Sequence, residues 1–449
     1  MNPIFLYENK HYNIAELKRS FKSIDINFFI EECLSRGIAK RKQTAVSFQY
    51  VGVIVFQNQL LLFLPKFLKE SLSDLEKIEK MKTILKVLKV YSKRSVTVQE
   101  LEFFGNFEQG ELFNYLSAAD YFINDYIENG LYHRDKIEYM INGNGEIDWQ
   151  QTIDSQASYL SKGQSPIYLE LVKEETLVDQ THVIIEIHKA ILNECSQYLT
   201  ASGLNNFLDY PSVQFPFDFS HLENKDFQLM KINDTLYQDY NDRNVTLLNN
   251  MYRYIAHEAF FTENKIVFFG TKSFYTVWEK CCASVMDHDE NIAISIPKPL
   301  WTNFIINDNN KDTLIPDILK NLVVNESSTL LIIDAKYYNI SFTKDKVIHN
   351  PGIQDVVKQY MYEKALHSYI QSKEIQNWYN IFLFPYSENT LVKGGEVSVS
   401  FLSDLKNINV IMLPADEIFA KYITYQKWGI KEWTLFIDII KNSTTAYTI

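Results

Sequence analysis

Residues 330–338, LLIIDAKYY, place two charged side chains at the end of an apolar run. The run predicts a buried β-strand, and alternate side chains of a strand share a face, so Asp334 and Lys336 project together. Charged groups at the end of such a strand are costly unless they face a wet site or bind a metal. The stretch therefore indicates a functional site where this strand ends.

A second acidic residue precedes this strand in the segment Ile315-Pro316-Asp317. We expect strands over residues 314–324 and 329–338, joined by a turn at residues 325–328, and their pairing would bring Asp317 alongside Asp334. Two carboxylates beside an ammonium form a site for a hard divalent cation such as Mg²⁺. Phosphodiester hydrolysis needs this set, because the metal polarises the phosphate and activates a water, while Lys336 positions or helps to deprotonate that water and offsets negative charge. The alternative is a surface salt bridge between Asp334 and Lys336, with Asp317 in a turn.

Two predicted helices flank these strands. The first, over residues 274–286, carries Glu279, and the second, from Asn350-Pro351 to about residue 371, carries Gln359. Together these segments resemble the PD-(D/E)xK nuclease core and, more narrowly, the McrC-like nuclease subunits, especially the LlaJI-type restriction endonuclease family. The resemblance touches roughly residues 45–425, and the segments that carry it are residues 50–54, 64–66, 145–153, 274–279, 316–317, 331–338, 350–355 and 358–360.

The resemblance implies a role for each residue of the set. Asp317, Asp334 and Glu279 would bind Mg²⁺, with Mn²⁺ as a substitute, Lys336 would be the catalytic lysine, and Gln359 would touch the phosphate or the attacking side of the site. Asp334 departs from the many members of the superfamily that have Glu at this position. Taken alone, Glu279 is also compatible with an exposed helical residue, and Gln359 with a solvated or core-edge amide.

The chain has no nucleotide-binding motif of the GxxxxGK(S/T) or GxGxxG type. If cleavage is coupled to nucleotide hydrolysis, the NTPase must therefore be a separate polypeptide. The resemblance implies such a partner, an AAA+ GTPase of the McrB type, contacted by residues 1 to about 160. It also implies double-stranded DNA as the substrate and allows for a DNA methyltransferase in the same system.

Composition and charge narrow the class of protein. The 449 residues include 46% hydrophobic and 22% charged residues, as in soluble folded proteins, and only four Cys. The net charge of −12 argues against a general nucleic-acid coat protein, but residues 1–100 carry +7 and the remainder −19. The basic segment 77–94 is either a solvated helix face, a DNA contact or a partner surface. No secretory signal or membrane span is evident, so we expect a cytoplasmic protein.

The hydrophobic pattern predicts a mixed α+β protein with three parts. We expect an N-terminal adaptor over residues 1–160, which contains β-strands, then a helical connector over 161–255 and a PD-(D/E)xK nuclease over 256–449. The principal elements that we predict are a hairpin at 45–67, a strand–turn–strand at 137–152, helices at 73–91, 109–129, 179–199, 244–261 and 416–425, and strands at 378–384, 397–402 and 410–413.

The function predicted from these features is Mg²⁺-dependent hydrolysis of duplex DNA by the cleavage subunit of a restriction system of type II or IV. Two alternatives stay open. The first is a stand-alone nuclease with the same core, such as a resolvase or transposon end-cutter. The second is a non-catalytic subunit that binds DNA or acts as a scaffold, in which the acidic pair has a structural role.

Overall fold

The computed structural model describes most of the chain and divides it into two compact units. The first unit contains Met1–Phe104 and Glu263–Ile449, and the second contains Gly105–Thr262. The predicted boundaries at residues 160 and 255 stay a prediction. The residues that the structure describes are 3–21, 24–57, 59–93, 115–178, 183–208, 210–257, 266–302, 307–309, 313–324, 327–343, 346–442 and 447–448.

A four-stranded sheet in the first unit joins distant parts of the sequence, in the order β1-β6-β5-β12. The strands are β1 (Ile4–Tyr7), β5 (Val51–Phe56), β6 (Gln59–Leu64) and β12 (Val267–Thr271). β5 and β6 form the predicted hairpin, and β12 adds to β5 in antiparallel register. The chain therefore returns to the N-terminal sheet just before it enters the segment that carries the predicted site.

Smaller elements complete this part of the first unit. They are α1 (Ile14–Ser20), α2 (Ile26–Ser35), α3 (Asp74–Ser92) and the sheet of β2 (His11–Asn13), β4 (Ala45–Phe48) and β3 (Ala39–Lys42). The predicted helix at 73–91 is confirmed as α3, which begins with a capping box between Ser73 and Glu76. Its basic residues are partly ion-paired, for example Lys80 with Asp416.

A six-stranded sheet, in the order β15-β16-β19-β21-β20-β22, forms the centre of the C-terminal part of the same unit. β16 and β19 are parallel, and α13 connects them and packs on both. β16 and β21 are buried along almost their whole length, which explains their unbroken apolar sequences. The elements are β15 (Ile318–Val324), β16 (Ser327–Ala335), α13 (Ile353–Ser372), β19 (Asn377–Tyr386), β20 (Thr390–Val397), β21 (Ile408–Pro414) and β22 (Tyr447–Thr448).

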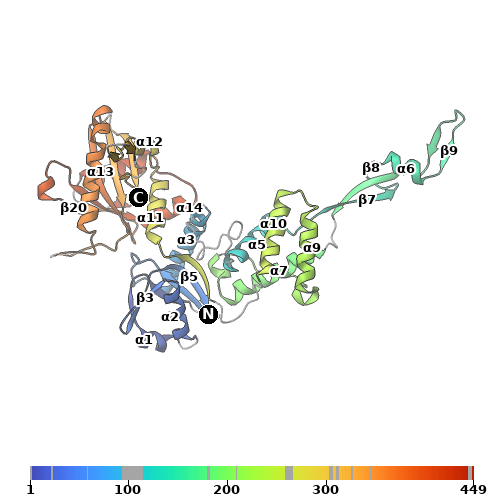
Figure 1. Ribbon diagram of the computed structural model, residues 1–449, viewed down its shortest axis with the longest axis horizontal. Helices are drawn as coiled ribbons and strands as arrows, with labels where there is room; N and C mark the ends of the chain where they lie inside the picture. Colours follow the sequence, from blue (N-terminus) through green and yellow to red (C-terminus); the bar gives the residue numbers. More distant parts are fainter. Residues whose placement is uncertain are drawn as a thin grey trace. The chain divides into compact units, whose positions relative to one another are not determined.

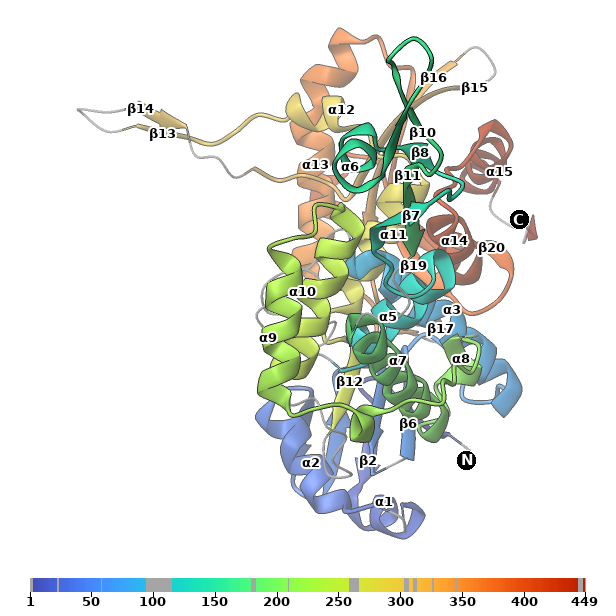
Figure 2. The same ribbon diagram turned by 90° about the vertical axis from the view of Figure 1, so that its right-hand side faces the viewer.

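Helices and short strands surround this sheet. They are α11 (Phe274–Val285), α12 (Glu290–Ile294), α14 (Ala415–Ile423), α15 (Ile430–Lys441), the pairs β13 (Leu300–Thr302) with β14 (Asn307–Asn309) and β17 (Ser341–Phe342) with β18 (Val347–Ile348), and the 3₁₀ turn η2 (Ser400–Leu402). The β13–β14 pair extends away from α12 (Figure 2). The prediction of a strand at 397–402 is wrong, because β20 ends at Val397 and a 3₁₀ turn follows. The helix predicted from Asn350 begins three residues later, at Ile353.

The second unit contains a helical part whose chief members are α5, α7, α9 and α10. α9 and α10 lie side by side, as Figure 2 shows, and α5 packs on α7. The starts of the helices predicted at residues 109 and 179 lie outside the described residues. The elements are α5 (Tyr115–Asn129), α7 (Val183–Ala201), α8 (Asn205–Leu208), η1 (Phe219–His221), α9 (Lys225–Leu236) and α10 (Asp242–Ala256).

An arm of short strands extends beyond the helices of the second unit (Figure 1). It consists of β7 (Asp135–Ile141), β8 (Glu146–Ile147), α6 (Trp149–Ser155), β9 (Ser158–Leu160), β10 (Pro166–Tyr168) and β11 (Val172–Val178). The predicted strand–turn–strand at 137–152 is confirmed in β7 and β8, although β8 is short and the two strands pair with β11 and not with each other. Residues 149–152, predicted as the end of the second strand, instead begin the helix α6, which Asp148 caps.

The structure confirms the predicted mixed α+β class, since sheets and helices occur in both units. In the described part of the chain, every helix is too short or too polar to cross a bilayer.

The close antiparallel pairing of β5 with β12 requires glycine on both strands. Gly52 and Gly270 lie opposite each other, and a Cβ on Gly270 would lie 2.3 Å from the carbonyl oxygen of Val51. We expect Gly270→Ala to lower the free energy of unfolding by about 1–3 kcal/mol, because the backbone would have to separate. Urea denaturation measures this change. Gly163→Ala, where the added methyl group meets only Ser161 Oγ at 3.8 Å, is the control and should change stability by less than about 0.5 kcal/mol.

His188 makes the stability of the second unit sensitive to acid. Burial, with a smaller contribution from Arg243, lowers the pKa of this fully buried side chain to about 3, and its Nδ1 accepts a hydrogen bond from the backbone N–H of Tyr132 at 3.0 Å. The unfolded chain takes up a proton near pH 6.5, so stability should fall by up to about 1.4 kcal/mol per pH unit between pH 6.5 and 3. Urea denaturation at pH 7.5 and pH 5 should show a smaller loss for His188→Asn, and an equal loss would contradict this assignment.

Candidate active site

The register of the β15–β16 hairpin places the two predicted aspartates together. Asp317 directly precedes β15, whose first residue, Ile318, pairs with Ile333 of β16. One step further along this antiparallel ladder, Asp317 lies opposite Asp334, and their carboxyl groups are within hydrogen-bond reach of each other. Asp317 Oδ2 also accepts a hydrogen bond from the backbone N–H of Ala335 at 2.8 Å. The structure thus brings together the pair that the sequence predicted to meet.

Lys336 joins this pair from the same strand. Its Nζ lies 2.7 Å from Asp334 Oδ2, and the Asp334 side chain is only 2% exposed. The backbone N–H of Lys336 donates to the carbonyl oxygen of Leu383, which continues the parallel pairing of β16 with β19 past the end of the strand. This hydrogen bond fixes the backbone of Lys336. Because alternate side chains of a strand share a face, the ammonium group then lies beside the buried carboxylate of Asp334.

Asp355, on α13, also binds Lys336. Asp355 Oδ1 accepts a hydrogen bond from Lys336 Nζ at 2.8 Å, and its other oxygen accepts one from the hydroxyl of Tyr338 at 3.3 Å. Burial by itself lowers the pKa of Lys336, but Asp334 and Asp355 together raise it above its ordinary value. Lys336 is therefore a charged ammonium group at neutral pH.

The two aspartates repel each other where no cation neutralises them. Burial raises the pKa of Asp317 above its ordinary value, and the neighbouring charges of Asp334 and Glu279 raise it further. A divalent cation between the carboxylates would remove this repulsion. The donor set therefore fits a hard cation, which takes carboxylate oxygens and completes its shell with water and phosphate oxygens.

Glu279 lies within electrostatic reach of the aspartates, on α11. Burial raises the pKa of this half-buried carboxyl group to about 7, with a further contribution from Asp334. Among the described residues, no three Asp, Glu, His or Cys side chains lie close enough together to hold a metal as they stand. Asp317 and Asp334 are thus the two carboxyl groups close enough to bind one cation together, and the side chain of Glu279 would have to move to join them.

Gln359 is buried on α13 and supports β16. Its Nε2 donates to the backbone carbonyl of Ile332 at 2.8 Å, two residues before Asp334, and the side chain has no exposed surface. The side chain therefore holds β16 against α13. Direct contact of Gln359 with a phosphate stays a prediction.

The N-terminal part of the first unit holds the residue that follows Lys336. The hydroxyl of Tyr337 donates to Glu8 Oε2 at 2.6 Å, and the ammonium group of Lys66 lies 4.4 Å from the centre of the Tyr337 ring. Glu8 is only 8% exposed, and its carboxylate also accepts the backbone N–H of Lys66 at 3.3 Å. This contact fixes the backbone at the end of β16 from the side of the first sheet.

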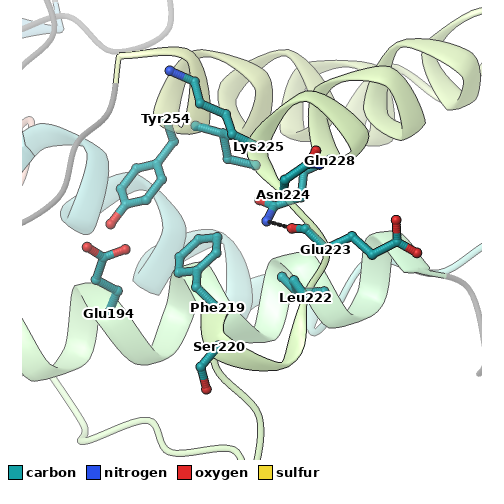
Figure 3. Close-up of a pocket in the computed structure, with 10 residues that line it drawn as sticks. Glu194, Phe219, Ser220, Leu222, Glu223, Asn224, Lys225, Gln228 and Tyr254 are labelled. Carbon is teal, nitrogen blue, oxygen red and sulfur yellow. Dashed lines mark hydrogen bonds between the residues drawn. The ribbon is translucent and has the colours of Figure 1, made fainter.

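A separate pocket lies among the helices of the second unit (Figure 3). It has a volume of about 390 Å³, and Phe219, Glu194 and Tyr254 contribute to its lining. Figure 3 shows the carboxyl group of Glu194 and the hydroxyl of Tyr254 facing each other. Burial raises the pKa of Glu194, while hydrogen bonds from Tyr254 and Tyr115 oppose this rise. This network satisfies the partly buried Glu194. The other carboxyl group that lines the pocket, Glu223, points away from Glu194 in Figure 3, so the two do not form a pair like Asp317 and Asp334.

Sequence reasoning missed two residues of the site, Asp355 and Glu8. Asp355 lies in the first turn of α13, and its place beside Lys336 follows only from the packing of this helix on β16. An acid in the first turn after a D-x-K strand is a signal that could have suggested it. Glu8 follows β1 and reaches Tyr337 across 329 positions of sequence, for which no local signal exists.

Comparisons with known proteins extend over most of the chain. A family model described as LlaJI restriction endonuclease matches residues 50–416. The chain is 30% identical over 455 residues to a Bacillus subtilis (strain 168) protein called type II restriction enzyme BsuMI component YdjA, covering 99% of this chain and 94% of that relative. It is also similar, with a TM-score of 0.38 and 12% identity, to a chain in a refined half-complex from a tetradecameric assembly of Thermococcus gammatolerans McrB AAA+ hexamers with bound McrC. This likeness covers 94% of this chain and 99% of that one.

Proposed function

Because the chain belongs to the LlaJI restriction endonuclease family, we propose that it is the subunit that cuts duplex DNA in a restriction system, and that Asp317, Asp334 and Lys336 form its active site. The observation that carries this proposal is the meeting of two carboxylates and one ammonium group at the end of a buried strand. Such an arrangement is costly for stability and suits phosphodiester hydrolysis.

Asp317 and Asp334 would hold Mg²⁺, or Mn²⁺ in its place, with Glu279 as the third acid. When bound, the metal would polarise the scissile phosphate and lower the pKa of a water that it binds. Asp334 is fixed for this role by its burial on β16, and Asp317 by its hydrogen bond from Ala335 N–H. The PD-(D/E)xK assignment rests on these positions.

Lys336 would act as a charge beside the scissile phosphate. Its raised pKa keeps it protonated at neutral pH, so it can donate hydrogen bonds to a phosphate oxygen and offset negative charge as that charge develops. Removal of a proton from the attacking water by Lys336 is disfavoured by the same charge. The two acids beside Lys336 therefore favour the electrostatic role over the role of general base.

We expect Asp334→Asn to reduce DNA cleavage by at least about 100-fold, because it removes the charge of a metal ligand and leaves the size of the side chain unchanged. The assay is the cutting of plasmid DNA by the protein with its NTPase partner and Mg²⁺, and EDTA should abolish it. Asp234→Asn, an exposed position on α9, is the matched control and should leave cleavage unchanged.

Other outcomes of this assay distinguish the competing functions. Cleavage without any NTP or partner would favour a stand-alone nuclease. An absence of metal-dependent cleavage under every nucleotide condition would favour a non-catalytic DNA-binding or scaffold subunit. Cleavage by Asp334→Asn at the unchanged rate would contradict the active site proposed here.

We further propose a separate McrB-like AAA+ GTPase as the partner, in a system that also contains a DNA methyltransferase. Two observations support a partner of this kind. The chain has no P-loop motif, and its Bacillus subtilis relative is named as one component of a restriction enzyme. A separate subunit would then supply any nucleotide hydrolysis that drives cleavage.

The arm of the second unit is the surface proposed to bind this partner. It exposes a set of large apolar side chains, and a large exposed apolar surface is typical of a site that binds another protein. Leu160 on β9 is 75% exposed and Leu169 is 69% exposed. The other members of this apolar set, all at least 40% exposed, are Ile137, Tyr139, Met140, Ile141, Trp149, Ile153, Tyr159 and Ile167.

We expect Leu160→Glu to weaken binding of the partner NTPase by about 10-fold or more, because it places a charge in an apolar contact. Co-purification and titration with the proposed McrB-like NTPase measure the change. Ile430→Glu, which alters a residue that is 85% exposed at the start of α15, is the matched control and should bind normally. Equal binding by Leu160→Glu would show that the partner uses another surface.

A further inference from the structure

Lys336 is shared between two carboxylates that have different places in the site. Its ammonium nitrogen lies 2.7 Å from Asp334 Oδ2 and 2.8 Å from Asp355 Oδ1. Asp334 is almost completely buried, whereas the side chain of Asp355 is 27% exposed. The ammonium group thus bridges the proposed metal ligand on β16 and a partly exposed acid on α13.

Asp355 is held in place independently of Lys336. It lies in the first turn of α13, and α13 packs on β16 and β19. Its Oδ2 accepts a hydrogen bond from the hydroxyl of Tyr338, while its Oδ1 is left to bind Lys336. The carboxylate is therefore oriented before any ligand arrives.

A divalent cation at Asp334 would compete with Lys336 for the same carboxylate. Both are positive, and both would approach the carboxylate oxygens of one side chain at contact distance, so they repel each other. Without a second acid, the ammonium group would either exclude the metal or leave the site. Asp355 offers a carboxylate that the ammonium group already binds and can keep.

We propose that Asp355 is a positioning residue that retains the ammonium group of Lys336 in the active site when Asp334 binds the catalytic metal. This inference rests on the function proposed above and adds to it a residue on a different element. Asp355 acts through Lys336 and binds neither the metal nor the phosphate. Its loss should therefore matter only while Lys336 carries its charge.

A double-mutant cycle read by Mn²⁺ binding tests this dependence on Lys336. The proteins are the unchanged chain, Asp355→Asn, Lys336→Met and the double variant, titrated with Mn²⁺ by electron paramagnetic resonance in the absence of DNA. We expect Asp355→Asn alone to weaken Mn²⁺ binding about 10-fold, because Lys336 then binds only Asp334. In the Lys336→Met background, the same change should weaken binding by about 2-fold or less.

Cleavage assays and a control complete the test. Asp355→Asn should lower kcat for plasmid cutting about 10-fold or more, and Asp355→Glu should recover part of this loss, because its carboxylate can still bind Lys336. Asp226→Asn removes an exposed acid from the first turn of α9 and should change neither Mn²⁺ binding nor cleavage. A role of Asp355 confined to helix stability would leave Mn²⁺ binding unchanged, and that result would overturn the proposal.

The remaining outcomes separate this inference from the function on which it rests. Equal weakening by Asp355→Asn with and without Lys336 would show a direct effect of Asp355 on the metal, and would overturn only the positioning role. Failure of the unchanged protein to bind Mn²⁺ would overturn the proposed metal site, and the positioning role with it.

Discussion

The ion pair between Asp334 and Lys336 is the interaction on which the rest of the site depends. Asp334 is 2% exposed, and an isolated carboxylate at such depth would be strongly destabilising. Lys336 compensates this charge at 2.7 Å, and the surrounding elements hold the two groups in place. β15 brings Asp317 to them, and α13 brings Asp355 and the amide of Gln359, which fixes β16. This end of the sheet is thus organised around one costly buried charge.

The N-terminal part of the first unit has a direct place in this organisation. β12 pairs with β5, and the chain then passes into α11, which carries Glu279. Glu8 binds Tyr337, the residue after Lys336. The first sheet therefore supports the end of β16 as well as forming a core of its own.

The second unit presents different chemistry. Its helices hold a partly buried acid, Glu194, and a fully buried neutral histidine, His188, whereas its arm exposes apolar side chains such as Leu160. The exposed apolar side chains of the arm suit a surface that binds another protein, while the charged cluster of the first unit suits a proposed contact with a phosphate. The two proposed roles of the chain thus correspond to two compact units of different surface character.

The sequence by itself determined the elements whose signals are local. The two-residue period of a strand placed Asp334 beside Lys336, a short hairpin brought Asp317 opposite Asp334, and helical periodicity located α3 and α11. Tertiary structure decided the contacts that depend on segments far apart in the chain. β11 lies between β7 and β8, although only a turn separates these two strands in the sequence, and Asp355 and Glu8 reach the site only through helix packing and sheet pairing. Local patterns fix which face a side chain takes, but the choice of distant partner follows from burial and hydrogen bonding summed over the whole fold, which no short stretch of sequence contains.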